Sequence, residues 1–284
     1  MKQITEKQIA AYQVYLAQAE KSAATAAKYL HSVTAFRAWL CGRAVERAAV
    51  LEYKAHLSAI YAPAGVNAAL SALNSFFDFC GRPDCKVKTL RIQRRIFASE
   101  EKELTKTEYA RLLAAAAGQK NRRLALLMQT VCSTGIRVSE IRFITVEAAR
   151  CGEAQIYCKG KTRRVFLPRR LCCMLLGYAK ERKLASGAIF VTRSGKPLDR
   201  SNIWREMKQL CIAAGVSEKK VFPHNLRHLF ARTYYAQQKD IVRLADILGH
   251  GSVNTTRIYT MESGAVHKRQ IERLGLLHPR GFTT

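Results

Sequence analysis

The stretch Arg82–Arg95, RPDCKVKTLRIQRR, divides the sequence into two parts. It begins like a turn at Pro83, carries six basic residues and shows little helical periodicity. Shortly after it, Thr105 and Glu108 fit a capping box that opens a new helix. The expected division is a first domain at residues 1–98, a linker at 99–104 and a second domain at 105–284.

The part before this stretch predicts a small helical bundle. Apolar residues recur at helical spacing in four segments, and Pro63 suits the first position of the last one. The expected helices are Thr5–Glu20, Thr25–Cys41, Val50–Tyr61 and a segment that starts at Pro63. Aromatic residues inside such helices are more typical of a core than of base stacking.

The part after it predicts a mixed α/β domain with a small antiparallel sheet, so the fold class is mainly α. Two β-like runs, Gln155–Cys158 and Arg164–Leu167, flank a basic tip at Lys159–Thr162, which is typical of a hairpin. Ala188–Thr192 is a candidate third strand. The expected helices are Thr105–Ala117, Asn121–Cys132, Arg169–Leu184, Ser201–Ala214, Asn225–Gln237, Ile241–Leu248 and Val266–Leu274.

The charge of the chain is strongly positive. Lys and Arg number 48 against 21 acidic residues, which gives a net charge of +27, and most of the excess follows residue 104. Such an excess predicts a polyanionic partner, and nucleic acid is favoured over an anionic lipid surface. Hydrophobic residues make up 48% of the sequence, enough to supply real cores.

Two features that the sequence lacks narrow the class of protein. No apolar run reaches the roughly 18 residues of a membrane span, and Met1–Ala10 has no apolar signal core. We therefore expect a cytoplasmic protein with no membrane partner. The nine cysteines do not form the paired C-x2-C pattern of a zinc site, so we expect no metal and no cofactor.

Four separated segments carry side chains that suit phosphodiester chemistry. In Ser133–Glu140, Gly135 permits a tight turn before Arg137. The hairpin tip offers Lys159 and Lys161. The remaining two segments are His224–His228, which contains His224 and Arg227, and Leu248–Tyr259, which contains His250 and Tyr259.

Breaking a phosphodiester bond without a metal requires a nucleophile, a charge clamp and two proton transfers. The nucleophile forms a covalent intermediate that conserves the bond energy. Arginine forks meet the negative charge on the nonbridging oxygens. An acid protonates the departing oxygen, and a base takes the proton of the nucleophile. Two arginines, two histidines, a lysine and a tyrosine supply all of these roles.

Each of these residues alone has a simpler interpretation. Arg137 is typical of an exposed helix start, a lysine at a hairpin tip is usually solvated, and a single Tyr259 is typical of half-buried packing. The functional interpretation depends on the four segments occurring together, in this order, in a basic chain.

The segments resemble the sequence boxes of the tyrosine recombinases, also called the phage integrase family. Thr134–Glu140 resembles the box with the first catalytic arginine, His224–His228 resembles the H-x-L-R-H box, and Leu248–Thr260 resembles the box that ends in the nucleophile. The pattern covers about residues 104–262. The helical first domain and the basic linker match the family's core-binding domain in size and place.

The resemblance implies a role for each site residue. Tyr259 is the expected nucleophile, which forms a 3′-phosphotyrosyl bond. Arg137 and Arg227 are expected to clamp the scissile phosphate, and His250 to hydrogen-bond it. His224 is expected to assist as a general base or to orient a neighbouring group.

The lysine role has two candidates on the hairpin. Lys159 is the expected acid for the 5′-oxygen because it precedes Gly160 directly after the first strand, and Lys161 is the alternative. The hairpin turn is one residue tighter than the family's usual G-K-G-x-K-x-R, which leaves this choice open. Glu140 is expected to support the site from behind, and Arg257 is assigned no role.

The resemblance also implies an assembly on double-stranded DNA that carries a specific recombination site. Two domains clamp the duplex, and four protomers exchange strands between two duplexes through a Holliday junction. The amphipathic C-terminal segment, with Val266, Ile271, Leu274 and Leu276, is expected to pack on a neighbouring protomer rather than on its own domain. A mobile-element integrase and a Xer-like resolvase of replicons both fit the sequence.

Two alternatives stay open at the level of sequence. A type IB topoisomerase uses the same chemistry but relaxes DNA as a monomer, and the separate first domain and short tail argue against it. A non-catalytic DNA-binding regulator could keep the fold, but the intact Arg137, Arg227, His250 and Tyr259 argue against it.

Overall fold

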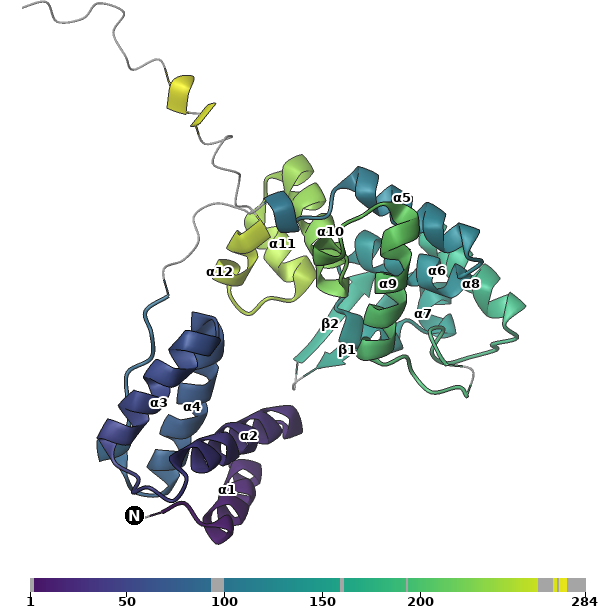
Figure 1. Cartoon of the computed structure of the whole chain (residues 1–284). Coiled ribbons are helices and arrows are strands. Elements are labelled where there is room, and N and C mark those ends of the chain that lie inside the picture. The colour runs from purple at the N-terminus through teal and green to yellow at the C-terminus, as the bar shows by residue number, and fades with distance from the viewer. Residues whose placement is uncertain are drawn as a thin grey trace, which may run out of the picture. The chain divides into compact units, whose positions relative to one another are not determined.

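The computed structural model describes residues 3–92, 100–158, 161–192, 194–259, 268–269 and 271–274. The chain forms two compact units, Met1–Arg94 and Arg95–Thr284 (Figure 1). Helices dominate both units, and one small antiparallel sheet lies in the second, so the predicted fold class is confirmed. Within the described ranges, none of the helices combines the length and the hydropathy that a bilayer crossing requires.

The first unit contains the four helices that the sequence predicts. They are α1 (Glu6–Gln18), α2 (Ala23–Leu40), α3 (Arg47–Ile60) and α4 (Pro63–Phe79). Local signals fix two of the starts. Thr5 and Gln8 form a capping box at α1, and Pro63 occupies the first turn of α4, where a missing N–H costs nothing.

Aromatic rings fill the core of the first unit. Tyr12, Phe36, Phe76 and Phe77 are fully buried. The ring of Tyr12 meets Phe76 edge-on at 5.1 Å, and its hydroxyl donates to the Oγ of Ser75 at 2.9 Å, so its buried polar end is satisfied. These rings are core residues, as the helical spacing predicts.

The second unit holds a longer series of elements. They are η2 (Glu100–Lys102), α5 (Lys106–Gly118), α6 (Arg122–Thr134), η3 (Val138–Phe143), α7 (Val146–Cys151), β1 (Glu153–Cys158), β2 (Lys161–Phe166), α8 (Arg169–Glu181), α9 (Arg200–Ala214), η4 (Glu218–Lys220), α10 (Pro223–Gln238), α11 (Ile241–Leu248), α12 (Val253–Thr256) and η5 (Arg257–Tyr259). The predicted capping box at α5 is present, with Thr105 accepting from the backbone N–H of Glu108 at 3.1 Å. The strands pair antiparallel, with Glu153 opposite Phe166.

The third strand predicted at Ala188–Thr192 is wrong. The structure has only two isolated bridges in this described run, at Ala188 and Val191. Ile189 and Phe190 are fully buried, so the apolar run reflects burial in the core. Short apolar runs do not distinguish a buried irregular segment from a strand.

Two further details differ from the sequence interpretation. Arg137 is the N-cap of the short 3-10 helix η3 rather than the start of an α-helix, and the short helix α7 that follows was not predicted. In the predicted C-terminal helix Val266–Leu274, residues 268–269 and 271–272 are helical, and the rest of that prediction lies largely outside the described residues.

Helix α10 is the element around which the second unit positions its polar residues. It packs against α6 on one side, and α11 and η5 pack against it as well (Figure 1). The amide of Asn225 donates to the carbonyls of Lys102 and Lys220 at 2.8 and 2.7 Å. Arg232 pairs with Glu103, so the first turn and the middle of α10 are fixed to the segment that precedes α5.

Candidate active site

Arg227 lies at the centre of a buried polar cluster. Only 1% of its surface is exposed, and its side chain reaches from α10 to the C-terminal ends of two other helices. Its Nη1 donates to the carbonyl of Gly135 at 2.6 Å, and its Nη2 donates to the carbonyl of Leu248 at 2.8 Å. Carbonyls at helix C-termini carry partial negative charge, which suits a buried cation.

His250 is the third partner of this guanidinium. Its Nε2 lies 2.9 Å from Nη2 of Arg227, and its Nδ1 lies 2.8 Å from the hydroxyl of Thr256. Because a guanidinium can only donate, Nε2 must accept, and the ring proton therefore resides on Nδ1. Burial, followed by the charge of Arg227, lowers the pKa of His250 to about 4, so the ring is neutral at pH 7.

Tyr259 also lies against Arg227. Only 4% of its surface is exposed, and its phenol lies close enough to the guanidinium to favour the charged form of Arg227. Burial and the charge of Arg137 lower the pKa of Arg227 to about 10, which still leaves it protonated at neutral pH. The cluster thus holds a positive charge beside a phenol oxygen.

Two imidazole rings extend from Tyr259 in series. His228 meets Tyr259 edge-on with 4.6 Å between ring centres, and His224 meets His228 edge-on at 4.6 Å. Burial, followed by His224, lowers the pKa of His228 to about 4. Burial, followed by the charge of Arg227, also lowers the pKa of His224. The neutral imidazole of His228, which can accept a proton, therefore lies against the phenol ring, and His224 lies next to His228.

Arg137 approaches the same cluster from η3. Its Nη1 pairs with Oε1 of Glu140 at 3.0 Å, and its Nη2 donates to the carbonyl of Gly249 at 3.3 Å. Burial alone would raise the pKa of Glu140, but hydrogen bonds from Arg137 and the charge of Arg163 outweigh it and hold that pKa below its usual value. The Arg137 side chain is 39% exposed, so its outer edge faces solvent.

Two glycines allow these side chains to approach the backbone. Gly135 and Gly249 both have positive φ, of 65° and 64°. A β-carbon at Gly135 would lie 2.5 Å from the Phe230 ring, and one at Gly249 would lie 2.4 Å from Cδ of Arg163. Both positions therefore require glycine for conformation and for space.

The structure brings most of the predicted site residues together. The five that gather in this cluster are Arg137, His224, Arg227, His250 and Tyr259. Lys159 lies outside the described residues, as does the side chain of Lys161. Glu140 lies behind Arg137, as predicted, and Arg257 is exposed on η5.

Three residues of the cluster were not singled out from the sequence. His228 links two predicted residues, Thr256 hydrogen-bonds Nδ1 of His250, and Arg163 pairs with Glu140. His228 stands in the H-x-L-R-H box, and Arg163 also offered a signal. With Val165 two residues later and buried, strand alternation places an arginine on the buried face of β2.

Comparison with known proteins identifies the family. Residues 102–264 match the model of the phage integrase family. Tyrosine recombinase XerA of Pyrococcus furiosus is 30% identical over 225 residues, which cover 76% of each chain. Tyrosine recombinase XerD of Xanthomonas axonopodis is 29% identical over 266 residues, which cover 84% of each chain.

Solved structures of the same fold include two DNA complexes. The lambda integrase (75–356) dimer bound to a COC′ core site has a TM-score of 0.74 at 19% identity, over 93% of this chain and 97% of that one. XerH recombinase bound to its difH substrate has a TM-score of 0.70 at 18% identity, over 96% and 84%. These likenesses support the fold, and the family resemblance read from the sequence boxes is confirmed. The chain belongs to the phage integrase family, the tyrosine recombinases, which are DNA-cleaving and rejoining enzymes.

Proposed function

We propose that this chain is a site-specific DNA recombinase that cleaves DNA with Tyr259. The observation that best supports this proposal is that Arg227, His250 and Tyr259 meet in one buried cluster, with Arg137 at its solvent edge. The relatives reported above are recombinases, and the solved XerH and lambda integrase complexes contain DNA. Integration or excision of a mobile element and resolution of replicons are both compatible with this activity.

The proposed reaction exchanges one phosphodiester for another. The phenol oxygen of Tyr259 attacks the scissile phosphorus and forms a 3′-phosphotyrosyl bond, while the bond to the 5′-oxygen breaks. The phenol proton passes toward His224, and Lys159 gives a proton to the departing 5′-oxygen. A 5′-hydroxyl of another strand reverses these steps and rejoins DNA, so the reaction needs no ATP.

The proposed clamp consists of Arg137, Arg227 and His250. The pentacoordinate state carries extra charge on its nonbridging oxygens, and two guanidiniums can each donate to them. A phosphate that enters the cluster competes with His250 for the Nη2 donors of Arg227, because both are acceptors. We infer that DNA binding separates this Arg227–His250 contact.

The burial of Tyr259 bears on the same step. With 4% of its surface exposed, the phenol cannot meet a phosphorus atom outside the cluster. We infer that the segment α12–η5 moves when DNA binds, since Tyr259 belongs to this short terminal segment rather than to a long helix.

The two units are proposed to share the DNA. The first unit, residues 1–98 in the sequence interpretation, is the core-binding domain, residues 99–104 are the linker, and residues 105–284 are the catalytic domain. The net charge of +27 supplies the attraction to phosphate. A lambda integrase tetramer bound to a Holliday junction shares the fold with a TM-score of 0.71, which supports a homotetramer on two duplexes.

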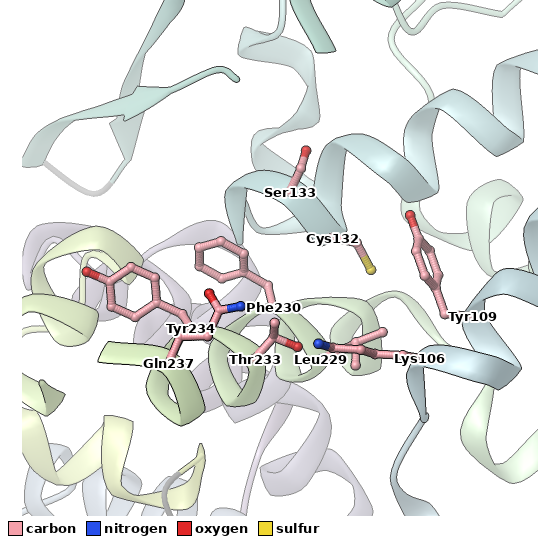
Figure 2. A pocket seen from close by; sticks show the side chains of 9 residues that line it. All are labelled: Lys106, Tyr109, Cys132, Ser133, Leu229, Phe230, Thr233, Tyr234 and Gln237. Atoms are coloured by element: carbon pink, nitrogen blue, oxygen red, sulfur yellow. The ribbon is translucent and has the colours of Figure 1, made fainter. Parts of the chain in front are cut away.

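The C-terminal segment is proposed to join neighbouring protomers. Ile271 and Leu274 lie on one turn and are exposed, which leaves apolar surface for another chain to cover. A cavity of about 430 Å³ between α5, α6 and α10 is a candidate for receiving it (Figure 2). Its lining includes Tyr109, Leu229 and Phe230.

The proposed location follows from the proposed substrate. A recombinase that acts on chromosomal or mobile-element DNA has to meet that DNA, so we propose a cytoplasmic protein. No cofactor or metal is required by the proposed chemistry, since arginines stabilise the charge and a lysine supplies the acid.

A nicked suicide substrate tests the proposal. Duplexes from the DNA that flanks the gene, nicked next to inverted repeats, lose a short fragment on cleavage and so trap the covalent intermediate. We expect wild-type protein to form an adduct that resists denaturing electrophoresis, and Tyr259→Phe to bind the same DNA with no adduct. A persistent adduct in Tyr259→Phe places the nucleophile elsewhere.

The same substrates separate the proposal from its alternatives. Wild-type protein that binds its site but traps nothing is a DNA-binding regulator rather than an enzyme. Formation of four-way junctions from two intact sites supports recombination, whereas relaxation of supercoiled DNA without junctions indicates a type IB topoisomerase.

A further inference from the structure

Arg163 occupies a position on β2 that the strand pattern assigns to an apolar residue. Cross-strand partners share a face of the sheet, and Arg163 lies opposite Ile156 while Val165 lies opposite Ala154. The three apolar residues are all buried. A charged side chain on such a face costs free energy unless its donors are paired, so Arg163 needs partners.

The partners of Arg163 come from two segments that are distant in the sequence. Its Nη2 lies 2.6 Å from Oε2 of Glu140, and its Nη1 donates to the carbonyl of Ile247 at 3.0 Å. Its Cδ packs against Gly249 so closely that a β-carbon added there would lie 2.4 Å from it. The side chain is only 16% exposed. Arg163 therefore ties the hairpin both to η3 and to the last turn of α11.

Glu140 serves two arginines with one carboxylate. Oε1 pairs with Arg137 and Oε2 pairs with Arg163, and only 2% of this side chain is exposed. Without Arg163, Arg137 is left as the ion-pair partner of a buried charge, and attraction between buried charges is weakly screened. Its guanidinium is then drawn toward Glu140 and away from any phosphate.

We propose that Arg163 is a positioning residue for DNA cleavage. By sharing Glu140 it keeps the donors of Arg137 available for the phosphate, and by holding the carbonyl of Ile247 it fixes the turn that presents His250. The proposal rests on the proposed function, since it requires Arg137 and His250 to act on the scissile phosphate.

A purely structural ion pair is the simpler interpretation of the same contacts. In that case loss of Arg163 lowers stability, and any loss of activity follows from the smaller folded fraction. The two interpretations differ in one respect. A positioning residue changes how strongly cleavage depends on the charge of the phosphate, and a structural one does not.

Three variants carry the first part of the test. Arg163→Ala and Arg163→Lys should cleave the suicide substrate about 10- to 100-fold more slowly, because lysine keeps the charge but not the fork that reaches two acceptors. Arg164→Ala is the matched control. Arg164 neighbours Arg163, is 65% exposed and pairs loosely with Glu153 at 3.8 Å, so cleavage should stay within about twofold.

DNA affinity and folding are measured alongside the rate. Fluorescence anisotropy at fixed salt should give all variants a Kd within about threefold of wild type, because many phosphate contacts share the binding energy. Thermal melting shows which variants are folded at the assay temperature. Arg163→Lys keeps the test decisive if Arg163→Ala unfolds.

Methylphosphonate DNA carries the second part of the test. A methyl group replaces one charged nonbridging oxygen at the scissile phosphate, so the transition state depends less on the arginine clamp. The rate ratio of wild type to Arg163→Ala should then shrink at least about fivefold relative to normal DNA. Arg137→Ala, which removes a proposed clamp residue, provides the reference for this behaviour.

The outcomes separate the inference from the proposed function. Equal deficits of Arg163→Ala on both substrates, or cleavage at the wild-type rate, overturn the positioning role. Absence of a covalent adduct in wild-type protein overturns the proposed function instead. A further support is non-additivity: Arg163→Ala should slow Glu140→Gln less than it slows wild type, because its main partner is already altered.

Discussion

Arg227 and Arg137 meet in the same cluster, yet the fold holds them by different means. Arg227 is 1% exposed and donates to the backbone carbonyls of Gly135 and Leu248, which sit at the ends of two helices. Arg137 is 39% exposed and is held by Glu140, whose other oxygen belongs to Arg163. One guanidinium is fixed by the backbone of the core, the other by a network of charges.

The difference indicates two distinct ways of preparing a site. A side chain that satisfies buried carbonyls is part of the fold, so its removal leaves unpaired acceptors as well as a missing charge. A side chain held by a carboxylate at the solvent edge can shift toward a phosphate without unfolding anything. Substitution of Arg227 should therefore lower both the cleavage rate and the stability of the fold, whereas substitution of Arg137 should lower the cleavage rate alone.

The largest effect is expected for Arg227→Lys. A lysine cannot reproduce the planar fork that meets Gly135, Leu248 and His250, so cleavage should fall about 1000-fold or more. Loss of buried hydrogen bonds should cost about 1–3 kcal/mol, which lowers the Tm by about 2–10 °C. Single-turnover cleavage and differential scanning calorimetry measure both. An unchanged Tm contradicts the structural half of this prediction.

Arg137→Lys should separate activity from stability. Its charge remains, but the fork is lost, so cleavage should fall about 100-fold. The Tm should stay within about 2 °C of wild type, since a lysine keeps a positive charge beside Glu140 and Arg163 still pairs with the other oxygen of that carboxylate. Near-normal cleavage removes Arg137 from the site, and a Tm loss as large as that of Arg227→Lys erases the contrast.

A smaller effect is expected at the turn that joins the two sides. Gly249→Ala places a β-carbon 2.4 Å from Cδ of Arg163 in a backbone with φ of 64°. Gly152→Ala is the matched control, because Gly152 also has positive φ but nothing lies within 4 Å of its added carbon. The control should lose about 1 kcal/mol from backbone strain alone, and Gly249→Ala about 1–3 kcal/mol more.

Urea denaturation of the two glycine variants measures this difference. Gly249→Ala should also slow cleavage, because Arg163 and His250 both depend on this turn, while Gly152→Ala should not. Equal losses of stability in the two variants mean that Arg163 yields to the added carbon without strain.

The sequence revealed the residues of the short boxes more readily than it revealed the role of Arg163. Arg227, His224 and His250 stand in short boxes whose residues are neighbours along the chain, so local pattern was enough to propose them. The contacts of Arg163 join residues 23 and 84 positions apart. Pairing at such separations depends on the folded arrangement, and a single sequence does not display it.

The same reasoning explains what was predicted of the fold. Amphipathic helices such as α4 and α11 were recognisable because their apolar spacing is local. The run at Ala188–Thr192 was misread because burial alone produced its apolar character. The burial of Tyr259 was equally invisible, since it depends on α10 and α11 packing around a segment that has no strong pattern of its own.

The smallest expected effect is a dependence of stability on pH that arises within the cluster. His228 and His250 have pKa values of about 4 in the folded chain against a usual 6.5, and burial is the main cause. The charged or titratable groups that face the two rings are His224, Arg227, Arg137, Arg163 and Arg232. Between pH 6.5 and 4 the unfolded chain therefore binds protons at these two histidines, whereas the folded chain leaves both rings neutral. Their neutral forms stabilise the fold fully above pH 6.5, and this contribution is lost as the pH falls toward 4.

Carboxylates titrate mainly below about pH 5, so the informative window runs from pH 6.5 to 5. Across it the Tm of wild type should fall by about 2–6 °C, and the double variant His228→Gln/His250→Gln should have a flatter profile. Calorimetry at half-unit steps of pH, with His31→Gln/His56→Gln in the first unit as the matched control, measures the two slopes. Parallel profiles for wild type and the cluster variant would mean that the two buried rings do not link protonation to folding, and that the neutral state assigned to His250 beside Arg227 is wrong.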